Sequence, residues 1–176
     1  MLVPLRNSNR LKGFDYSSPG YYFVTISTAR NRPIFGRTGV GNRIVLSRLG
    51  WIAEEIWLRN DLVYPHFRND EFCLMPDHFH ALVQLIKPGN SSIPVPSLST
   101  IVRSFKGCVT KEIRSATSDS SFNVWQHGFH EKIVNNDQAL NRIRDYIMNN
   151  PQKLNEQIEG RRLAEDLLSG KHRTDM

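Results

Sequence analysis

Residues 66–87 read HFRNDEFCLMPDHFHALVQLIK, and the fold that we predict depends on this stretch. Two runs rich in apolar and aromatic residues, 66–75 and 77–87, are separated only by Pro76. Each run has the length and composition of a β-strand. Proline has no N–H for the hydrogen-bond ladder and belongs at a bend or a strand end. We therefore predict two adjacent strands, joined as a tight hairpin or as one bent strand.

The segments on either side alternate between strand and helix patterns. Before the pair, residues 21–28 (YYFVTIST) are typical of a strand, residues 31–42 of a loop, and residues 44–59 of an amphipathic helix. After a loop at 88–96, Ser97 is expected to cap a helix that runs to residue 114. A strand over 129–134 follows, and then a helix that opens at 136 or 137 and that Pro151 ends.

This order, β-α-β-β-α-β, is that of the ferredoxin-like fold. We therefore predict an α+β domain with an antiparallel sheet, helices on one of its faces, and an additional helix near the C-terminus. Residues 1–151 are expected to form this domain, and residues 152–176 a basic tail that is partly helical. Because the fold hosts many functions, the function must be inferred from particular side chains.

Composition and charge limit the class of protein. The chain has 176 residues and is 39% hydrophobic, which suffices for one domain with its own core. We find no run near the roughly 18–20 apolar residues of a membrane helix, and no signal-peptide pattern at the start. Two cysteines without metal-site spacing predict free buried thiols and a cytoplasmic protein. The net charge of +6 favours a polyanion such as nucleic acid or an anionic membrane surface, although a basic surface alone gives the same charge. We expect a nucleic-acid partner and no membrane partner.

His78 and His80 stand in an apolar run with Phe79 between them. On a strand, alternate side chains point to the same face, so the two imidazoles project together while Phe79 points to the other side. Two neutral imidazoles side by side can bind a divalent metal. A pair of this kind is also common as a surface feature or as hydrogen-bonded core histidines, and these three residues do not decide between the readings.

Tyr146 and Asn150 lie four residues apart on the predicted last helix, so both fall on one face of it. Tyr146 is at the edge of the apolar stripe, where a ring is half-buried and its hydroxyl free. An amide oxygen from Asn150 would complete a metal site made by the two histidines. The alternative is that Tyr146 packs on the sheet and Asn150 belongs to the helix stop.

Together these residues suggest phosphodiester chemistry. A metal held by two imidazoles and an amide keeps open positions for phosphate oxygens and acts as a Lewis acid. A phenol is only about 0.1% ionised at pH 7, so a tyrosine nucleophile such as Tyr146 needs activation. Attack by Tyr146 on a phosphodiester leaves a covalent phosphotyrosine and one free strand end.

At this point the sequence resembles the HUH single-tyrosine transposases, and within them the REP-associated tyrosine transposases. The likeness covers about residues 13–151. The matching stretches are GFDYSSPGYYFVTIST (13–28), LMPDHFHALV (74–83), IVRSFKGCVTKEI (101–113), VWQHGFHEKIV (124–134) and NRIRDYIMNNP (141–151).

By position, His78 and His80 match the family's histidine pair, Tyr146 its nucleophile, and Asn150 its third metal ligand. That ligand is a glutamine in better-known relatives, and asparagine is shorter by one methylene. The resemblance implies Mg²⁺ or Mn²⁺ as cofactor, a 5′-phosphotyrosine intermediate, and single-stranded DNA with a hairpin-forming palindromic repeat as substrate. It is compatible with a monomer or a homodimer.

Four further residues are candidates for DNA contacts. Arg103 and Lys106 lie off the apolar stripe of their helix, and the resembling family stretch also carries a lysine at Lys106. Arg142 shares the Tyr146 side of its helix. Trp125 either stacks on a base or fills the core. The main alternative to an enzyme is a module that binds hairpin DNA or RNA without cleaving it, such as a decayed transposase.

Overall fold

The structure is a computed structural model that describes residues 13–87 and 96–168. Four strands form its main sheet: β1 (Gly20–Ser27), β4 (Phe67–Leu74), β5 (His78–Leu85) and β6 (His130–Val134). The long helices are α1 (Arg48–Leu58), α3 (Leu98–Thr117), α4 (Asp137–Met148) and α5 (Asn150–Leu168). The short elements are a 3-10 turn (Ala29–Asn31), β2 (Gly36–Thr38), β3 (Ile44–Leu46) and α2 (Asn60–Val63).

The main sheet has the strand order β4-β5-β1-β6, and every neighbouring pair is antiparallel. Strands β4 and β5 form a hairpin around Pro76, as one of the two sequence alternatives predicted. Together with α1 and α3 these strands give the β-α-β-β-α-β order. The predicted ferredoxin-like α+β fold is therefore confirmed.

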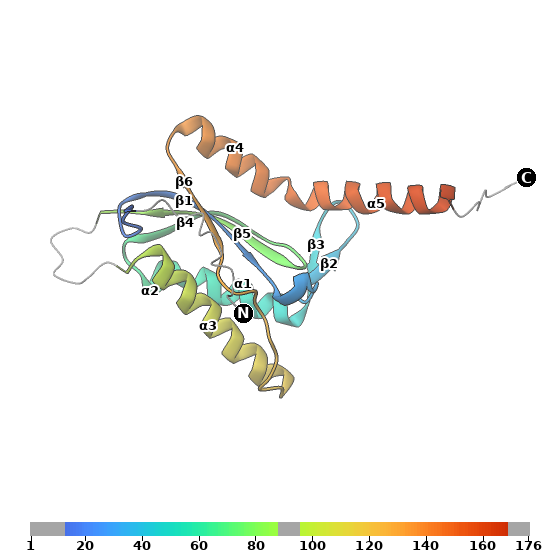
Figure 1. Cartoon of the computed structure of the whole chain (residues 1–176), viewed down its shortest axis with the longest axis horizontal. Helices are drawn as coiled ribbons and strands as arrows, with labels where there is room; N and C mark the ends of the chain where they lie inside the picture. The colour runs from blue at the N-terminus through green and yellow to red at the C-terminus, as the bar shows by residue number, and fades with distance from the viewer. Residues whose placement is uncertain (1–12, 88–95, 169–176) are drawn as a thin grey trace, which may run out of the picture.

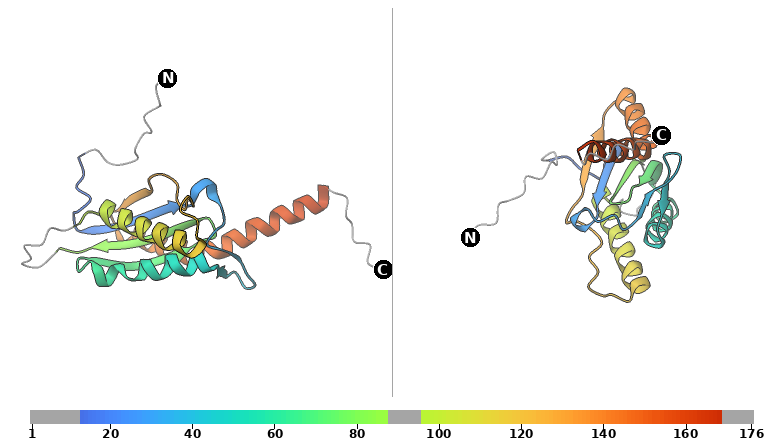
Figure 2. Two further views of the ribbon diagram at one scale, coloured as in Figure 1. Left: turned by 90° about the horizontal axis from the view of Figure 1, so that it is seen from below. Right: turned by 90° about the vertical axis from the view of Figure 1, so that its right-hand side faces the viewer.

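Helices cover both faces of the sheet (Figure 1). Helices α1 and α3 pack on one face, where the core contains buried residues of α1, α3 and alternate residues of β5, among them Phe79 and Val83. Helix α4 packs on the opposite face, where Leu140 and Ile147 lie against Leu82. Figure 2 shows the same three layers from two further directions. The prediction of helices on one face thus holds for α1 and α3, and α4 adds the third layer.

The region before α1 differs from the prediction. Residues 44–46 form β3 and pair with β2, within what was expected to be a loop followed by helix. The side chain of Ser47 accepts a hydrogen bond from the Gly50 N–H and so fixes the start of α1. The β-branched residues before Ser47 then remain extended and are free to pair with β2. Helix α3 begins after Ser97 as predicted but continues to Thr117, three residues beyond the expected end.

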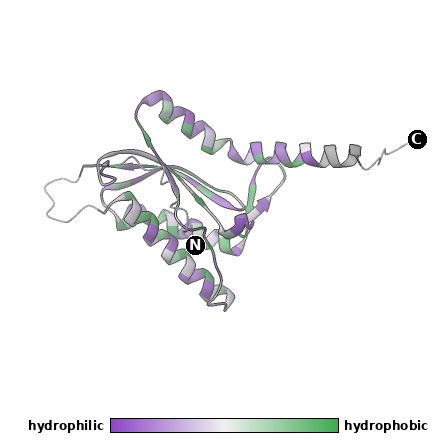
Figure 3. Cartoon of the chain, in the orientation of Figure 1, coloured by the Kyte–Doolittle hydropathy of each residue, from purple (hydrophilic) through white to green (hydrophobic). Residues whose placement is uncertain are grey.

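Pro151 does not end the helical region. Helix α4 stops at Met148, and Pro151 is the second residue of α5, in the first turn, where proline is tolerated. The expected domain boundary after residue 151 therefore falls inside α5. Near its start α5 is joined to the β2–β3 hairpin by a 3.0 Å hydrogen bond from Asn155 Nδ2 to Asn42 Oδ1. Beyond this contact α5 projects from the body of the molecule, and its described part is mostly hydrophilic (Figures 1 and 3).

Both cysteines are free, as predicted, but only Cys73 is partly buried. Cys108 is exposed on α3, so the expectation that both thiols are buried is wrong. Within the described residues, we find no helix that is both long and apolar enough to cross a membrane.

Candidate active site

His78 and His80 lie on the α4 face of the sheet, because they alternate with Phe79 along β5. Phe79 is fully buried on the other face. The two imidazole centroids are 4.6 Å apart. His80 is only 5% exposed, whereas His78 is half-buried. The strand alternation therefore brings the two rings together, as the sequence predicted.

A neighbouring oxygen holds the Nδ1 atom of each histidine. Thr25 lies opposite His80 on β1, and its Oγ1 is 2.9 Å from His80 Nδ1. The Oδ1 of Asp77 is 2.6 Å from His78 Nδ1. The Asp77 carboxylate accepts only, so it favours the tautomer of His78 with the proton on Nδ1 and the lone pair on Nε2. The Thr25 hydroxyl can accept from or donate to His80 Nδ1, and it is an acceptor for the same tautomer of His80. Histidine metal ligands commonly donate their other ring N–H to an oxygen atom of this kind.

His80 is in an environment that disfavours a positive charge. Burial, and secondarily the nearby His78, lower the pKa of His80 from 6.5 to about 3. The imidazole is therefore neutral at physiological pH. A neutral ring is the form that can accept a hydrogen bond or bind a metal at Nε2.

Tyr146 projects from α4 to the histidine pair. Its hydroxyl oxygen is 3.3 Å from His80 Nε2, and its side chain stays 38% exposed. Phe23 completes the cluster by stacking on His80 with centroids 5.4 Å apart and meeting Tyr146 edge-on at 6.0 Å. Residues 66 positions apart in the chain thus converge, with the phenol open to solvent on one side.

An ion pair and apolar contacts hold α4 over the sheet. Arg144 donates to both carboxylate oxygens of Asp70, at 2.8 and 2.6 Å. Asp70 lies at a β-bulge in β4, where the register with β5 shifts between Asn69 and Glu71. Since Arg144 is two residues before Tyr146, this bidentate pair helps to fix where the tyrosine lies.

Asn150 is buried at the junction of α4 and α5, one helical turn beyond Tyr146. Two imidazoles and an amide are chemically suitable for a divalent metal with open positions, so these side chains fit such an ion. We find no cluster of three or more His, Cys, Asp or Glu suited to a metal among residues 13–87 and 96–168. The contribution of Asn150 as a third ligand stays a prediction from the sequence.

The sequence analysis missed three residues at the site. These are Thr25 and Asp77, which hold the histidines, and Lys153, whose Nζ is 5.1 Å from the centroid of the Tyr146 ring. Lys153 follows Tyr146 by seven residues, which is two helical turns. That spacing was a usable signal, but we expected the helix to end at Pro151.

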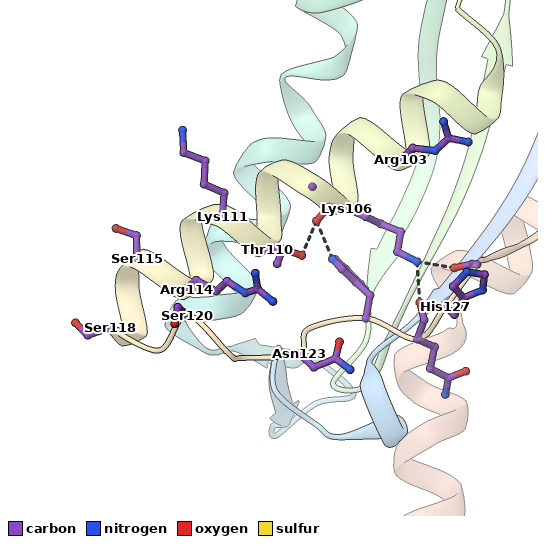
Figure 4. Close-up of a pocket in the computed structure, with 14 residues that line it drawn as sticks. Arg103, Lys106, Thr110, Lys111, Arg114, Ser115, Ser118, Ser120, Asn123 and His127 are labelled. Carbon is purple, nitrogen blue, oxygen red and sulfur yellow. Dashed lines mark hydrogen bonds between the residues drawn. The ribbon is translucent and has the colours of Figure 1, made fainter.

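The predicted DNA-contacting residues lie mostly elsewhere. Three of them, Arg103, Lys106 and Trp125, line a groove of about 890 Å³ between α3 and residues 118–128 (Figure 4). We call this feature the α3 groove. The fourth, Arg142, is exposed on α4. Burial lowers the pKa of Lys106 to about 8, so its ammonium remains charged at pH 7. That ammonium donates to the carbonyl oxygens of Gln126 at 2.8 Å and Gly128 at 2.5 Å, which ties it to the protein.

Trp125 is only 7% exposed. Its ring packs against Phe35 and Phe105, and its indole N–H donates to the Lys106 carbonyl at 3.2 Å. Of the two roles considered for Trp125, this burial supports core packing and leaves little of the ring free to stack on a base. A DNA contact by Trp125 stays a prediction.

Comparisons with known proteins show the family to which the chain belongs. The family model for IS200-like transposases matches residues 45–150. An uncharacterized protein of Haemophilus influenzae is 31% identical over 161 residues, which cover 83% of this chain and 88% of the relative. A protein of the same organism named as a REP-associated tyrosine transposase is 31% identical over 94 residues, 51% of this chain and 52% of the relative.

Among solved structures, a REP-associated tyrosine transposase bound to a REP hairpin aligns with a TM-score of 0.58 at 19% identity. The alignment covers 83% of this chain and 73% of that one, which shows a shared fold. The family match spans well over half of the sequence and includes His78, His80, Tyr146 and Asn150. The chain therefore belongs to the IS200-like transposase family.

Proposed function

We propose that this protein cleaves and rejoins single-stranded DNA through a covalent phosphotyrosine at Tyr146. The observation that carries the proposal is the 3.3 Å approach of the Tyr146 hydroxyl oxygen to His80 Nε2. A solvent-accessible phenol beside two imidazoles whose Nδ1 atoms are already engaged has the arrangement of a nucleophile next to an ion-binding pair. Packing of the tyrosine ring on the sheet would not by itself require its hydroxyl to lie beside His80 Nε2.

The reaction replaces one phosphoester bond with another. The Tyr146 oxygen attacks the phosphorus and forms an O–P bond, and the phenolic proton is lost. The bond from phosphorus to the 3′ oxygen breaks, and that oxygen takes up a proton to give a free 3′-OH. The downstream strand remains attached through its 5′ phosphate, so a 3′-OH can later reverse the step without a nucleoside triphosphate.

His78, His80 and Asn150 would hold the cation, for which we propose Mg²⁺ or Mn²⁺. When bound, such an ion supplies Lewis-acid polarisation of the phosphate and stabilises the phenolate. The protein's own contribution is orientation. Thr25 and Asp77 fix the two rings, Phe23 packs against His80 and Tyr146, and the Arg144–Asp70 pair positions the helix that carries the nucleophile.

We further propose that the substrate is DNA with a hairpin formed by a palindromic repeat. Support comes from the relative named as a REP-associated tyrosine transposase and from the solved relative that is bound to a REP hairpin. The basic net charge of +6 is consistent with a nucleic-acid substrate.

The test is an incubation of the protein with end-labelled hairpin oligonucleotides from repeats near its own gene. Reactions contain Mg²⁺, Mn²⁺ or EDTA, and a denaturing gel resolves the products. We expect a protein–DNA adduct with either metal, no adduct in EDTA, and none with Tyr146→Phe. A hairpin that is bound but not cleaved under any condition would instead support the non-catalytic binding module.

A further inference from the structure

The α3 groove lies apart from the active site and has a strongly basic lining. Arg103, Lys106, Lys111 and Arg114 come from α3, and His127 comes from the facing loop. None of its lining residues is acidic. Figure 4 shows Lys106 reaching from α3 across to the loop, where it is tied to two carbonyl oxygens. Arg103, Lys111 and Arg114 are exposed and able to bind an anionic ligand. Arg114 also interacts with Asp119, and its Nε donates to the Phe122 carbonyl oxygen at 3.1 Å.

Gly107 lies within helix α3 at the centre of this lining. Arg103, Gly107, Thr110 and Arg114 follow one another at spacings of four, three and four residues, so they form one stripe along α3. Glycine inside a helix is less stable than alanine there. A Cβ placed on Gly107 meets no atom within 4 Å, so close packing does not require the glycine. The glycine leaves the surface of α3 between the two arginines without a side chain at its position.

The lining suits a sugar–phosphate backbone and not bases. Trp125, the aromatic residue of the lining, is buried and its N–H is engaged. The exposed groups are guanidinium, ammonium, imidazole, hydroxyl and amide groups, which bind phosphate oxygens. Binding here should therefore be independent of sequence and sensitive to salt.

The groove is linked directly to the catalytic face. The Gln126 N–H donates to the Ser27 carbonyl at 2.9 Å, and Ser27 lies opposite His78 in the sheet. Only strand β1 therefore separates the groove's loop from the histidine pair. The groove opens on the α3 side of the sheet, and the histidines project on the α4 side.

We propose that the α3 groove binds the sugar–phosphate backbone of the DNA next to the cleaved strand, so that one DNA molecule passes around the β6 edge of the sheet from α3 to Tyr146. The proposal rests on the proposed function, because it assigns the groove to the same substrate. It assigns Arg103, Arg114 and Lys111 to phosphate contacts, Gly107 to the point of closest approach, and Lys106 to holding the loop.

The test measures DNA binding without cleavage. All variants are made in full-length Tyr146→Phe protein, and fluorescence anisotropy in EDTA follows binding of a labelled hairpin with a single-stranded extension over a range of KCl concentrations. Gly107→Leu adds bulk without changing charge, and Gly107→Ala is its matched control. Arg103→Gln with Arg114→Gln removes two charges, and Arg59→Gln, at the far end of α1, is the control for charge loss.

We expect the double arginine variant to lower the slope of log K against log salt by about 2, and to lower affinity about 60-fold at 0.1 M salt if the electrostatic part vanishes at 1 M. Gly107→Leu should weaken binding of hairpins of any sequence to a similar extent, whereas Gly107→Ala and Arg59→Gln bind like the parent. Circular dichroism confirms that each variant is folded.

Parental affinity and salt slope in folded Gly107→Leu and double arginine variants would overturn the groove proposal. Adduct formation by the unmodified protein is a separate readout, so the proposed function would survive that result. If the unmodified protein forms no adduct and these variants lose affinity for DNA, the groove proposal would be supported and the proposed cleavage activity would be refuted. A parent protein that binds no DNA would overturn both.

Discussion

The hydrogen bond between Thr25 and His80 allows a test of the proposed metal site with almost no change in shape. Thr25→Val replaces the hydroxyl with a methyl group and keeps a side chain that is favourable in a strand. His80 is 5% exposed, so water has little access to replace the lost oxygen at Nδ1. A metal at Nε2 requires the proton to stay on Nδ1, where it would then have no acceptor.

A buried N–H without an acceptor costs about 1–3 kcal/mol, which corresponds to a weakening of metal binding by about 5- to 150-fold. The metal-free protein can avoid a buried N–H without an acceptor, because the proton can move to Nε2, 3.3 Å from the Tyr146 oxygen; Nδ1 is then an acceptor without a donor. We therefore expect Thr25→Val to weaken Mn²⁺ binding and to lower the melting temperature of the metal-free protein modestly.

Titration of Mn²⁺ followed by electron paramagnetic resonance measures the affinity, and calorimetry measures the melting temperature. Thr25→Ser retains a hydroxyl and should restore most of the affinity. Equal Mn²⁺ affinities for the valine variant and the parent would refute the reasoning that this hydrogen bond sets the tautomer of His80.

Three further predictions concern the same architecture. The pKa of His80 is about 3 in the folded protein and near 6.5 in the unfolded protein, so the unfolded state binds more protons between these values. The free energy of unfolding should therefore fall as the pH drops from 6.5 towards 3. Urea unfolding should show this decline, and the decline should be less steep in His80→Asn. Arg144→Met leaves Asp70, whose side chain is 15% exposed, without its cation, and it should lower the unfolding free energy by about 1–3 kcal/mol. A double variant that also carries Asp70→Asn should regain part of this loss. Equal stability of the single and the double variant would argue against the ion pair. Lys106→Met should speed amide hydrogen exchange in the loop at 126–128, and unchanged exchange would show that the lysine does not hold it.

The sequence sufficed for the four strands of the main sheet and for the placement of His78 beside His80, because both depend on local alternation. The face of α4 that is turned to the sheet also followed from the apolar stripe of the helix, since Leu140 and Ile147 of that stripe are buried. In these cases the pattern and the packing obey the same periodicity. The placement of Tyr146 at the edge of the stripe, half-exposed, follows for the same reason.

Other features depended on information that no local pattern contains. Strands β2 and β3 have three residues each, too few for a periodic signal. The role of Thr25 depends on the register between β1 and β5, which is set by packing over 55 residues of separation. Lys153 was missed because a proline is compatible both with the end of one helix and with the first turn of the next.

The role of Trp125 could not be decided from the residue type and its place in the sequence. An aromatic residue beside a basic helix is compatible with base stacking and with core packing, and the sequence left both open. Contacts with Phe35 and Phe105, from distant parts of the chain, decide for the core. The cations around it remain on the surface and define the α3 groove.

The most direct test of the account is to locate the covalent link. Trypsin cleaves after Arg144 and Lys153, so residues 145–153 form one peptide whose only tyrosine is Tyr146. After incubation with hairpin DNA and Mn²⁺, then nuclease and trypsin digestion, mass spectrometry should find a nucleotide 5′-phosphate on this peptide. Its attachment to any other peptide, or an adduct that forms equally in EDTA, would contradict the account.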